Sequence, residues 1–182
     1  MQRQLLRVLA ERRYNERLID KGFTLVELIV VVVIIGILSA IAVPAFNASA
    51  DKAKQKEATT LLASYVKAAQ AYYTENSSWP TTRAQLSQFV TVVGCTTANP
   101  AVCKTRTPAN YQNYNAAGSW YSPQGLYQIV WQPGTVSYFR AIPAGNFRNS
   151  GYGVSACFNS TTGSTKVVDQ TTKGPSVPNV GC

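Results

Sequence analysis

A single carboxylate, that of Glu27, lies in an otherwise apolar run of the sequence. The run extends from Phe23 to Phe46, and no other side chain within it is ionisable. A charged side chain in such a segment is energetically costly unless it has a partner. We therefore expect Glu27 to form an ion pair with a dedicated cationic group.

The remaining residues offer little catalytic chemistry. The chain has no His, so a nucleophile and base pair has no imidazole to use. After Phe23 there are only five acids, namely Glu27, Asp51, Glu57, Glu75 and Asp169. Asp169 lies near the end of the chain, but a single acid supplies too few ligands for a calcium site, because Ca²⁺ takes six to eight oxygen ligands. The sequence predicts no enzyme, no cofactor and no metal site.

The element that carries Glu27 is predicted to be a long helix. An apolar stretch of about 20 residues is typical of a membrane-spanning helix. Beyond it, apolar residues recur with helical spacing at Ala58, Leu61, Leu62, Tyr65, Val66, Ala69, Tyr72 and Tyr73. One helix of about 75 Å is therefore predicted from about Phe23 to Thr74. Its amphipathic half is expected to pack on its own domain, and its apolar half to protrude.

The four cysteines all follow the apolar run, which favours disulfides formed in an oxidising compartment. Four cysteines allow three pairings. The pairing predicted here joins Cys95 to Cys103 in a small loop and Cys157 to Cys182, which ties the chain end to the body. A zinc site has little support, because there is no His and no C-x-x-C.

The second half of the chain predicts an antiparallel sheet. Runs rich in β-branched and aromatic residues are bounded by Gly, Pro and Asn at residues 126–132, 135–142, 152–158 and 165–169. Three or four strands over the long helix give an α+β fold. The Thr- and Asn-rich stretch from 76 to 125 has no clear pattern, and no detailed structure is predicted for it.

The chain is basic, with a formal net charge of +9. The segment before Phe23 has six basic and three acidic residues, which leaves 11 basic and five acidic residues, or +6, in the rest. Six basic residues of the body are candidates for binding polyanions such as DNA or sulfated sugars: Lys104, Arg106, Arg140, Arg148, Lys166 and Lys173. Plain solubility is the alternative explanation of this charge.

The segment around Glu27 resembles the type IV prepilin signature. The matching residues run from Lys21-Gly22-Phe23-Thr24-Leu25-Val26-Glu27 into the apolar run. The resemblance implies that a membrane prepilin peptidase cleaves between Gly22 and Phe23, and that Phe23 is then N-methylated. The long charged leader and the Tyr- and Thr-rich body also resemble cyanobacterial pilins.

The resemblance also implies a role for Glu27 in assembly. Cleavage would give Phe23 a new amino group, and Glu27 lies one helical turn away. The family pairs this acid with the Phe23 amine of a neighbouring subunit. The alternative is that Glu27 reaches the membrane interface or is stabilised at its own helix N-terminus.

A glycine and a proline interrupt the apolar run at Gly36 and Pro44. Both residues weaken a helix interior, and filaments of the family often unwind between such a pair. The prediction is a continuous, kinked helix in the lone subunit and extended backbone between these residues in the filament. A kink alone is the alternative.

The predicted function is that of a structural subunit of a type IV pilus. The alternatives are a minor pilin, a type II secretion-like pseudopilin, or a membrane-anchored module that binds polyanions. The implied partners are other pilin subunits, the prepilin peptidase, the pilus assembly platform and motor, and DNA or surface glycans. The subunit is expected first in the inner membrane, with its body outside the cytoplasm, and then in an extracellular pilus that supports twitching motility, adhesion, aggregation or DNA uptake.

Five segments follow from this interpretation. They are a cleaved leader (1–22), an apolar membrane and filament-core half-helix (23–46), an amphipathic half-helix (47–75), a variable region (76–125), and a region of antiparallel strands with the second disulfide (126–182).

Overall fold

The fold is a long helix and an antiparallel sheet, seen in a computed structural model that describes residues 22–104, 111–113 and 118–182. By contacts the chain divides into two units, Met1–Phe46 and Asn47–Cys182. The helices are α2 (Leu25–Asn76), α3 (Arg83–Leu86), α4 (Pro100–Cys103) and the 3-10 helix η1 (Gly145–Phe147). The strands are β1 (Val93–Cys95), β2 (Tyr111–Asn113), β3 (Gly118–Tyr121), β4 (Tyr127–Gln132), β5 (Val136–Pro143), β6 (Val154–Asn159) and β7 (Thr165–Asp169).

The predicted long helix is confirmed as α2, which has 52 residues. It continues through Gly36 and Pro44. It ends where Ser77 takes a positive φ of 51°, while the Ser77 backbone N–H still donates to the carbonyl oxygen of Tyr73. A left-handed residue directly after the last turn is a common way to end a helix.

The four strands predicted in the second half of the chain are confirmed as β4 to β7, although the predicted total of three or four is too low. Within the described residues the sheet has seven strands in the order β2-β1-β3-β4-β5-β6-β7, all antiparallel. The three additional strands come from the 76–125 region. They are only three or four residues long, too short to show an alternating pattern.

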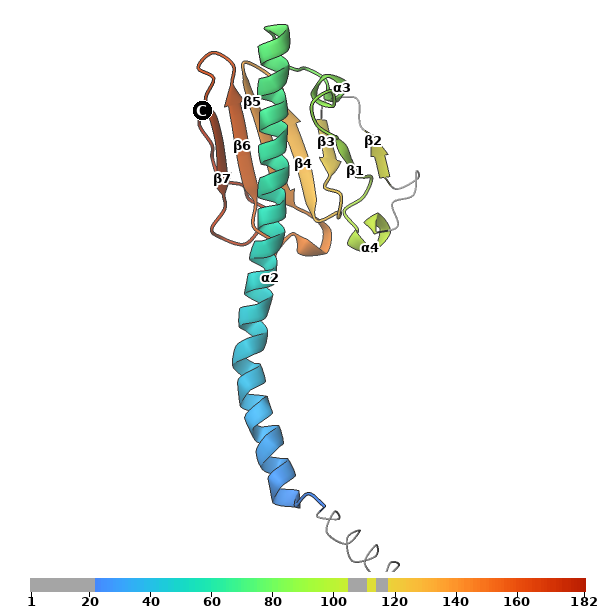
Figure 1. The fold of residues 1–182 in the computed structure, drawn as a ribbon, viewed down its shortest axis with the longest axis vertical. Helices are drawn as coiled ribbons and strands as arrows, with labels where there is room; N and C mark the ends of the chain where they lie inside the picture. Colours follow the sequence, from blue (N-terminus) through green and yellow to red (C-terminus); the bar gives the residue numbers. More distant parts are fainter. Residues whose placement is uncertain (1–21, 105–110, 114–117) are drawn as a thin grey trace, which may run out of the picture. The chain divides into compact units, whose positions relative to one another are not determined.

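The core lies between the body part of α2 and one face of the sheet (Figure 1). The predicted helical stripe supplies buried Ala58, Leu62, Tyr65, Val66, Ala69 and Tyr72. From the sheet, Trp120, Trp131 and Phe139 face the helix, and the rings of Trp131 and Phe139 stack with centroids 5.8 Å apart. Tyr65 contacts the Trp120 and Phe139 rings. Aromatic contacts of this kind stabilise a core beyond the area they bury.

Strand β1 packs closely against its neighbour β3 in the sheet. A Cβ atom on Gly94 would lie 2.2 Å from the carbonyl oxygen of Tyr121 in β3, so no larger residue fits. Among the described residues, β1 and β3 pair at Cys95 and Tyr121. The close approach lets these two short strands join the sheet.

Candidate functional site

The α2 helix starts immediately after the predicted cleavage junction. Gly22, Phe23 and Thr24 are exposed and precede the helix, and 82% of Phe23 is accessible. The Thr24 hydroxyl accepts a hydrogen bond of 3.2 Å from the backbone N–H of Glu27. Thr24 thereby caps the helix and satisfies one of the N–H groups that a first turn leaves unpaired. Glu27 lies in this first turn, where a negative charge is favourable.

The segment from Gly22 to Phe46 is exposed throughout. Its large apolar side chains are about half accessible or more, from 48% at Ile29 to 82% at Phe23. Among the described residues α2 is the one helix long and apolar enough to cross a membrane. Apart from its chain neighbours and the adjacent backbone of its own helix, Gly36 has no atom within 4 Å of the place its Cβ would occupy. This surface therefore requires lipid or other apolar partners.

An ionic cluster lies where the body part of α2 begins. The Asp51 carboxylate is almost buried and accepts bonds from Lys54 at 3.2 Å and from Lys173 at 2.8 Å. Burial by itself raises the pKa of Asp51, but the hydrogen bonds and charges of Lys173 and Lys54 together outweigh it and hold the pKa below its usual value. The hydrogen bond to Asp51 raises the pKa of Lys173. The pair joins residues 122 positions apart in the chain.

Polar contacts continue one turn along α2. The Gln55 amide donates to the carbonyl oxygens of Gln170 at 2.8 Å and Gly153 at 3.3 Å. Asp169, at the end of β7, accepts hydrogen bonds from Thr59 and Lys56. Together with the ionic cluster, these bonds fasten the chain after β7 to the helix.

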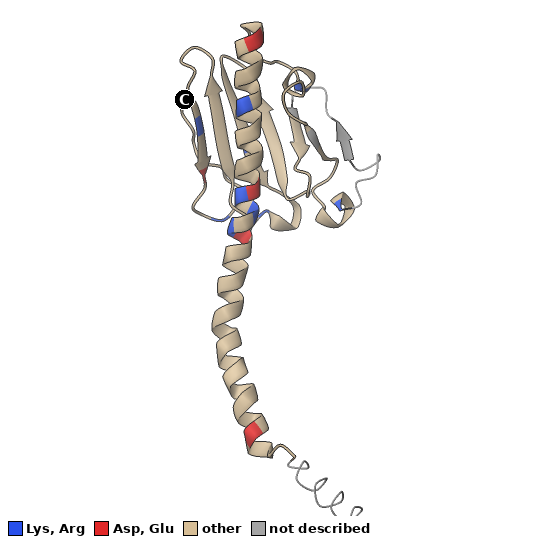
Figure 2. Ribbon diagram, viewed as in Figure 1, with Lys and Arg blue, Asp and Glu red and all other residues tan. Residues whose placement is uncertain are grey.

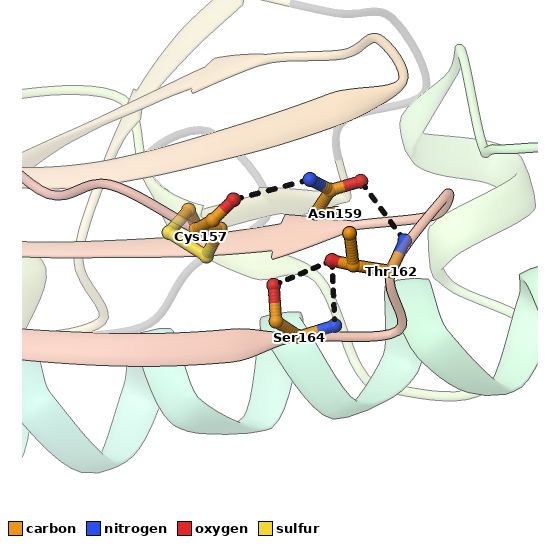
Figure 3. Close-up of a disulfide and its surroundings, with 5 residues drawn as sticks. Cys157, Asn159, Thr162 and Ser164 are labelled. Carbon is orange, nitrogen blue, oxygen red and sulfur yellow. Dashed lines mark hydrogen bonds between the residues drawn. A yellow bond between two sulfur atoms is a disulfide. The ribbon is translucent and has the colours of Figure 1, made fainter.

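Both predicted disulfides are present, Cys95–Cys103 and Cys157–Cys182. The second one attaches the chain end to β6. Asn159 supports it, because its amide donates to the Cys182 carbonyl oxygen at 3.1 Å. The side-chain oxygen of Asn159 accepts from the backbone N–H of Thr162 (Figure 3) and from that of Thr161. The chain before Cys182 passes so close to Gly153 that a Cβ there would lie 2.3 Å from the Ser176 carbonyl oxygen. The last residues are thus fixed at both ends of β6.

The described residues contain shallow grooves but no assembled catalytic group. One mostly apolar groove of about 460 Å³ lies along α2 between Glu57, Leu61, Ser64 and Pro123, and partial burial raises the pKa of Glu57 there. Another, of about 350 Å³, lies beside the first disulfide and is lined by Cys103, Lys104 and Gln124 among others. In the described part of the chain no three His, Cys, Asp or Glu side chains are placed to hold a metal ion.

The predicted polyanion-binding residues that the structure describes do not form one patch. Arg106 lies outside the described residues. Lys104 follows α4, Lys166 lies on β7, and Arg140 lies on the face of β5 that points away from α2, with its guanidinium 6.0 Å from the Tyr138 ring. Arg148 and Lys173 are near each other, since Gly174 bonds to Gly151 and Gly151 bonds to Phe147.

Two features of this site were not predicted. The capping role of Thr24 has a signal in the sequence, the T-x-x-E pattern of Thr24 and Glu27, which is typical of a helix start. The pair of Asp51 and Lys173 has none, because neither residue stands in a motif and only the fold brings them together.

Comparison with known proteins gives the context of these observations. Residues 18–43 match the family model described as the prokaryotic N-terminal methylation motif. The chain is 40% identical over 76 residues to the fimbrial protein EcpC of Eikenella corrodens, covering 42% of this chain and 50% of that protein. It is 43% identical over 82 residues to the type IV major pilin protein PilA of Myxococcus xanthus, covering 45% and 33%. It is 40% identical over 62 residues to the type IV major pilin protein PilE1 of Neisseria gonorrhoeae, covering 34% and 38%.

The aligned region spans half or less of the length of these relatives. No solved structure matches the chain. The resemblance to cyanobacterial pilins stays a prediction. The chain thus carries the methylation motif and, over part of its length, is similar to fimbrial proteins and type IV major pilins.

Proposed function

We propose that the chain is a structural subunit of a type IV pilus that assembles through its N-terminal helix. The observation that carries the proposal is the start of α2, where an exposed Gly22–Phe23 junction precedes an exposed apolar helix with one acid in its first turn. The relatives named above are fimbrial proteins and major pilins. A filament would cover the apolar surface that the single chain leaves exposed.

Processing would create the partner of Glu27. The prepilin peptidase would cut after Gly22 and methylate the new Phe23 amine, and that amine would pair with Glu27 of a neighbouring subunit. In the filament core such a pair neutralises two charges that are costly when separate. It would also set the axial register, since a shifted subunit leaves the acid unpaired.

The test replaces Glu27 in a strain that keeps its peptidase. Glu27→Ala and Glu27→Leu should abolish or strongly reduce surface filaments while the processed subunit accumulates in the membrane. Glu75→Gln is the matched control, because Glu75 is an exposed acid on the same helix. Normal filaments from both Glu27 variants would rule out the assembly role.

Mass spectrometry of sheared surface fibres separates a major subunit from a minor pilin or pseudopilin. An abundant chain that begins at methylated Phe23 is expected for a major pilin. A chain found in trace amounts, or only in the membrane, would favour the minor pilin or pseudopilin.

Assembly would also change the helix. We propose that the backbone between Gly36 and Pro44 becomes extended in the filament. Proline lacks the N–H that a helix interior needs, and glycine has the lowest helix propensity of the residues other than proline. Hydrogen exchange in assembled fibres should then be faster between these residues than on either side. Uniform protection from hydrogen exchange between Leu25 and Asn76 would contradict the proposed extended segment.

The subunit would reside in the inner membrane with its body outside the cytoplasm, and the assembly platform and motor would transfer it to an extracellular pilus. Motility, adhesion, aggregation and DNA uptake are the outcomes proposed for such a fibre. A basic body would bind DNA through phosphate contacts, which weaken steeply with salt. DNA binding by purified fibres that does not change between low and high salt would contradict a role for the basic residues.

A further inference from the structure

Basic residues, blue in Figure 2, gather at the end of the body where its part of α2 begins. We call Lys52, Lys54, Lys56, Arg148 and Lys173 the basal patch. Contacts join its parts. Lys54 and Lys173 both bond to Asp51, and the Lys54 ammonium lies 4.7 Å from the ring centre of Phe147, the residue before Arg148. Lys56 bonds to Asp169 at the end of β7.

The basal patch has more positive charge than its own acids neutralise. Three of its five basic side chains, those of Lys54, Lys56 and Lys173, bond to two carboxylates, those of Asp51 and Asp169, so five positive charges face two negative ones. The paired lysines remain accessible, with side-chain exposures of 39% for Lys54, 70% for Lys56 and 41% for Lys173. Lys52 and Arg148 are exposed, and neither has an ion pair with a described residue.

The position of the basal patch along the helix matches a membrane surface. The apolar run Phe23–Phe46 has 24 residues, or about 36 Å of helix, against a hydrocarbon core of about 30 Å with roughly 5–7 Å of headgroups on each side. Lys52 follows Phe46 by six residues, which is about 9 Å of rise. Lysine and arginine reach toward a polar layer with their heads while their stems pack on apolar surface.

We propose that the basal patch binds the headgroups of anionic phospholipids while the subunit is in the membrane. The inference rests on the proposed membrane stage of the function. Lipid phosphates fit the observations because Lys52 of the patch follows the apolar run by only six residues along the helix, which corresponds to the depth of the headgroup layer. The contacts would hold the body at a defined height before assembly and would be given up when the subunit leaves the membrane.

The test uses the full chain in vesicles with equal amounts of phosphatidylcholine and phosphatidylglycerol. Spin-labelled forms of each lipid report, by electron paramagnetic resonance, which one the protein retains beside it. The variant is Lys52→Gln with Arg148→Gln, which removes two exposed charges that have no ion pair among the described residues. The control is Lys67→Gln with Lys166→Gln, which removes two exposed charges of the body outside the basal patch.

The wild-type chain should prefer phosphatidylglycerol at low salt. The patch variant should lower this preference by roughly fivefold or more, because each basic residue at an anionic surface changes the affinity by about that factor. The control variant should keep the preference, and high salt should remove it from all three proteins. The leader is identical in all of them, so its charges do not alter the comparison.

Two results would overturn the proposal. One is an unchanged lipid preference in the patch variant, and the other is an equal loss in the control, which would show an effect of net charge alone. If the patch variant lost filaments but kept its lipid preference, an acidic protein surface rather than lipid would be the partner. The lipid measurement does not depend on whether Glu27 variants form filaments. A failure of the proposed pilus function would therefore be detected by the filament test and not by the lipid test.

Discussion

At the scale of single residues, Thr24 and Glu27 show that a short motif can serve two purposes. Thr24 caps α2 by accepting from the Glu27 backbone N–H, and Glu27 places its charge in the first turn. The helix N-terminus therefore stabilises the acid in the lone subunit. A partner amine in the filament would add to this stabilisation and not replace it.

The cap can be tested by hydrogen exchange in detergent micelles. Thr24→Ala removes the acceptor of the Glu27 N–H, and a lost cap costs about 1 kcal/mol. Exchange of the amide of Glu27 should therefore be about fivefold faster than in the wild type. Thr24→Ser keeps the hydroxyl and should behave like the wild type, whereas equal exchange in the two variants would contradict the role of Thr24.

Asp51 predicts a pH-dependent contribution to stability. Its pKa is lower in the folded chain than the unfolded value of about 3.9. Its stabilising effect is therefore complete well above that value and is lost as the pH falls through the folded pKa. Asp51→Asn should lower the free energy of unfolding by about 1–2 kcal/mol at neutral pH, and the difference from the wild type should vanish in acid.

Urea unfolding followed by tryptophan fluorescence at a series of pH values measures this difference. Glu75→Gln, on an exposed acid of the same helix, should leave the stability nearly unchanged at every pH. If the difference in the free energy of unfolding between wild type and Asp51→Asn stays constant down to the lowest pH, the ionised carboxylate does not cause that difference.

At the scale of elements, the chain after β7, residues 170–182, connects the sheet to the helix, and we call this segment the strap. It is fixed to β6 by the Cys157–Cys182 disulfide and the Asn159 amide. It is fixed to α2 by Lys173 and by the carbonyl oxygen of Gln170. Ser155 and Cys157 are fully buried although they lie on the face of β6 away from the helix, the face to which Cys182 is bonded. The strap therefore connects the two layers of the fold.

The two disulfides should differ in their effect on stability. The residues of the Cys157–Cys182 pair are 25 positions apart and those of Cys95–Cys103 are eight apart. The chain-entropy account then gives about 3.5 and 2.5 kcal/mol respectively. Serine substitution of Cys157 and Cys182 should lower the thermal midpoint more than substitution of Cys95 and Cys103, as measured by circular dichroism. The reverse order would show that local packing around the first loop outweighs chain entropy.

At the scale of the whole molecule, the two units have different physical requirements. The described residues of the first unit, Gly22 to Phe46, are all exposed. The buried core that the structure describes lies in the second unit, together with both disulfides. The body therefore has the means to fold by itself, whereas the apolar run depends on lipid or sister subunits.

A fragment from Asn47 to Cys182 tests this division. It should be soluble without detergent, unfold in one cooperative transition and form both disulfides, because it loses no core residue. Size-exclusion chromatography, circular dichroism and mass measurement before and after reduction provide the readouts, with the full chain in detergent as the reference. An aggregated fragment, or one without a cooperative transition, would show that the first unit is needed for the body to fold.

The sequence alone determined the features that depend on neighbours along the chain. The apolar run, the helical stripe from Ala58 to Tyr73 and the motif around Phe23 are local patterns, and they predicted α2 and the family. The four strands of the second half were also found, because each is long enough to show its β-branched and aromatic residues between turns. The cysteine spacing led to the disulfide pairing that the structure contains.

Only the tertiary structure decided the contacts between distant segments. Strands β1 to β3 are too short to have a pattern of their own, and β1 approaches β3 so closely that only a glycine fits at Gly94. Asp51 and Lys173 meet across 122 positions, and Arg148 joins the basal patch through Phe147. Such contacts depend on how the helix, sheet and strap pack, and a packing arrangement is not written in the periodicity of any one segment.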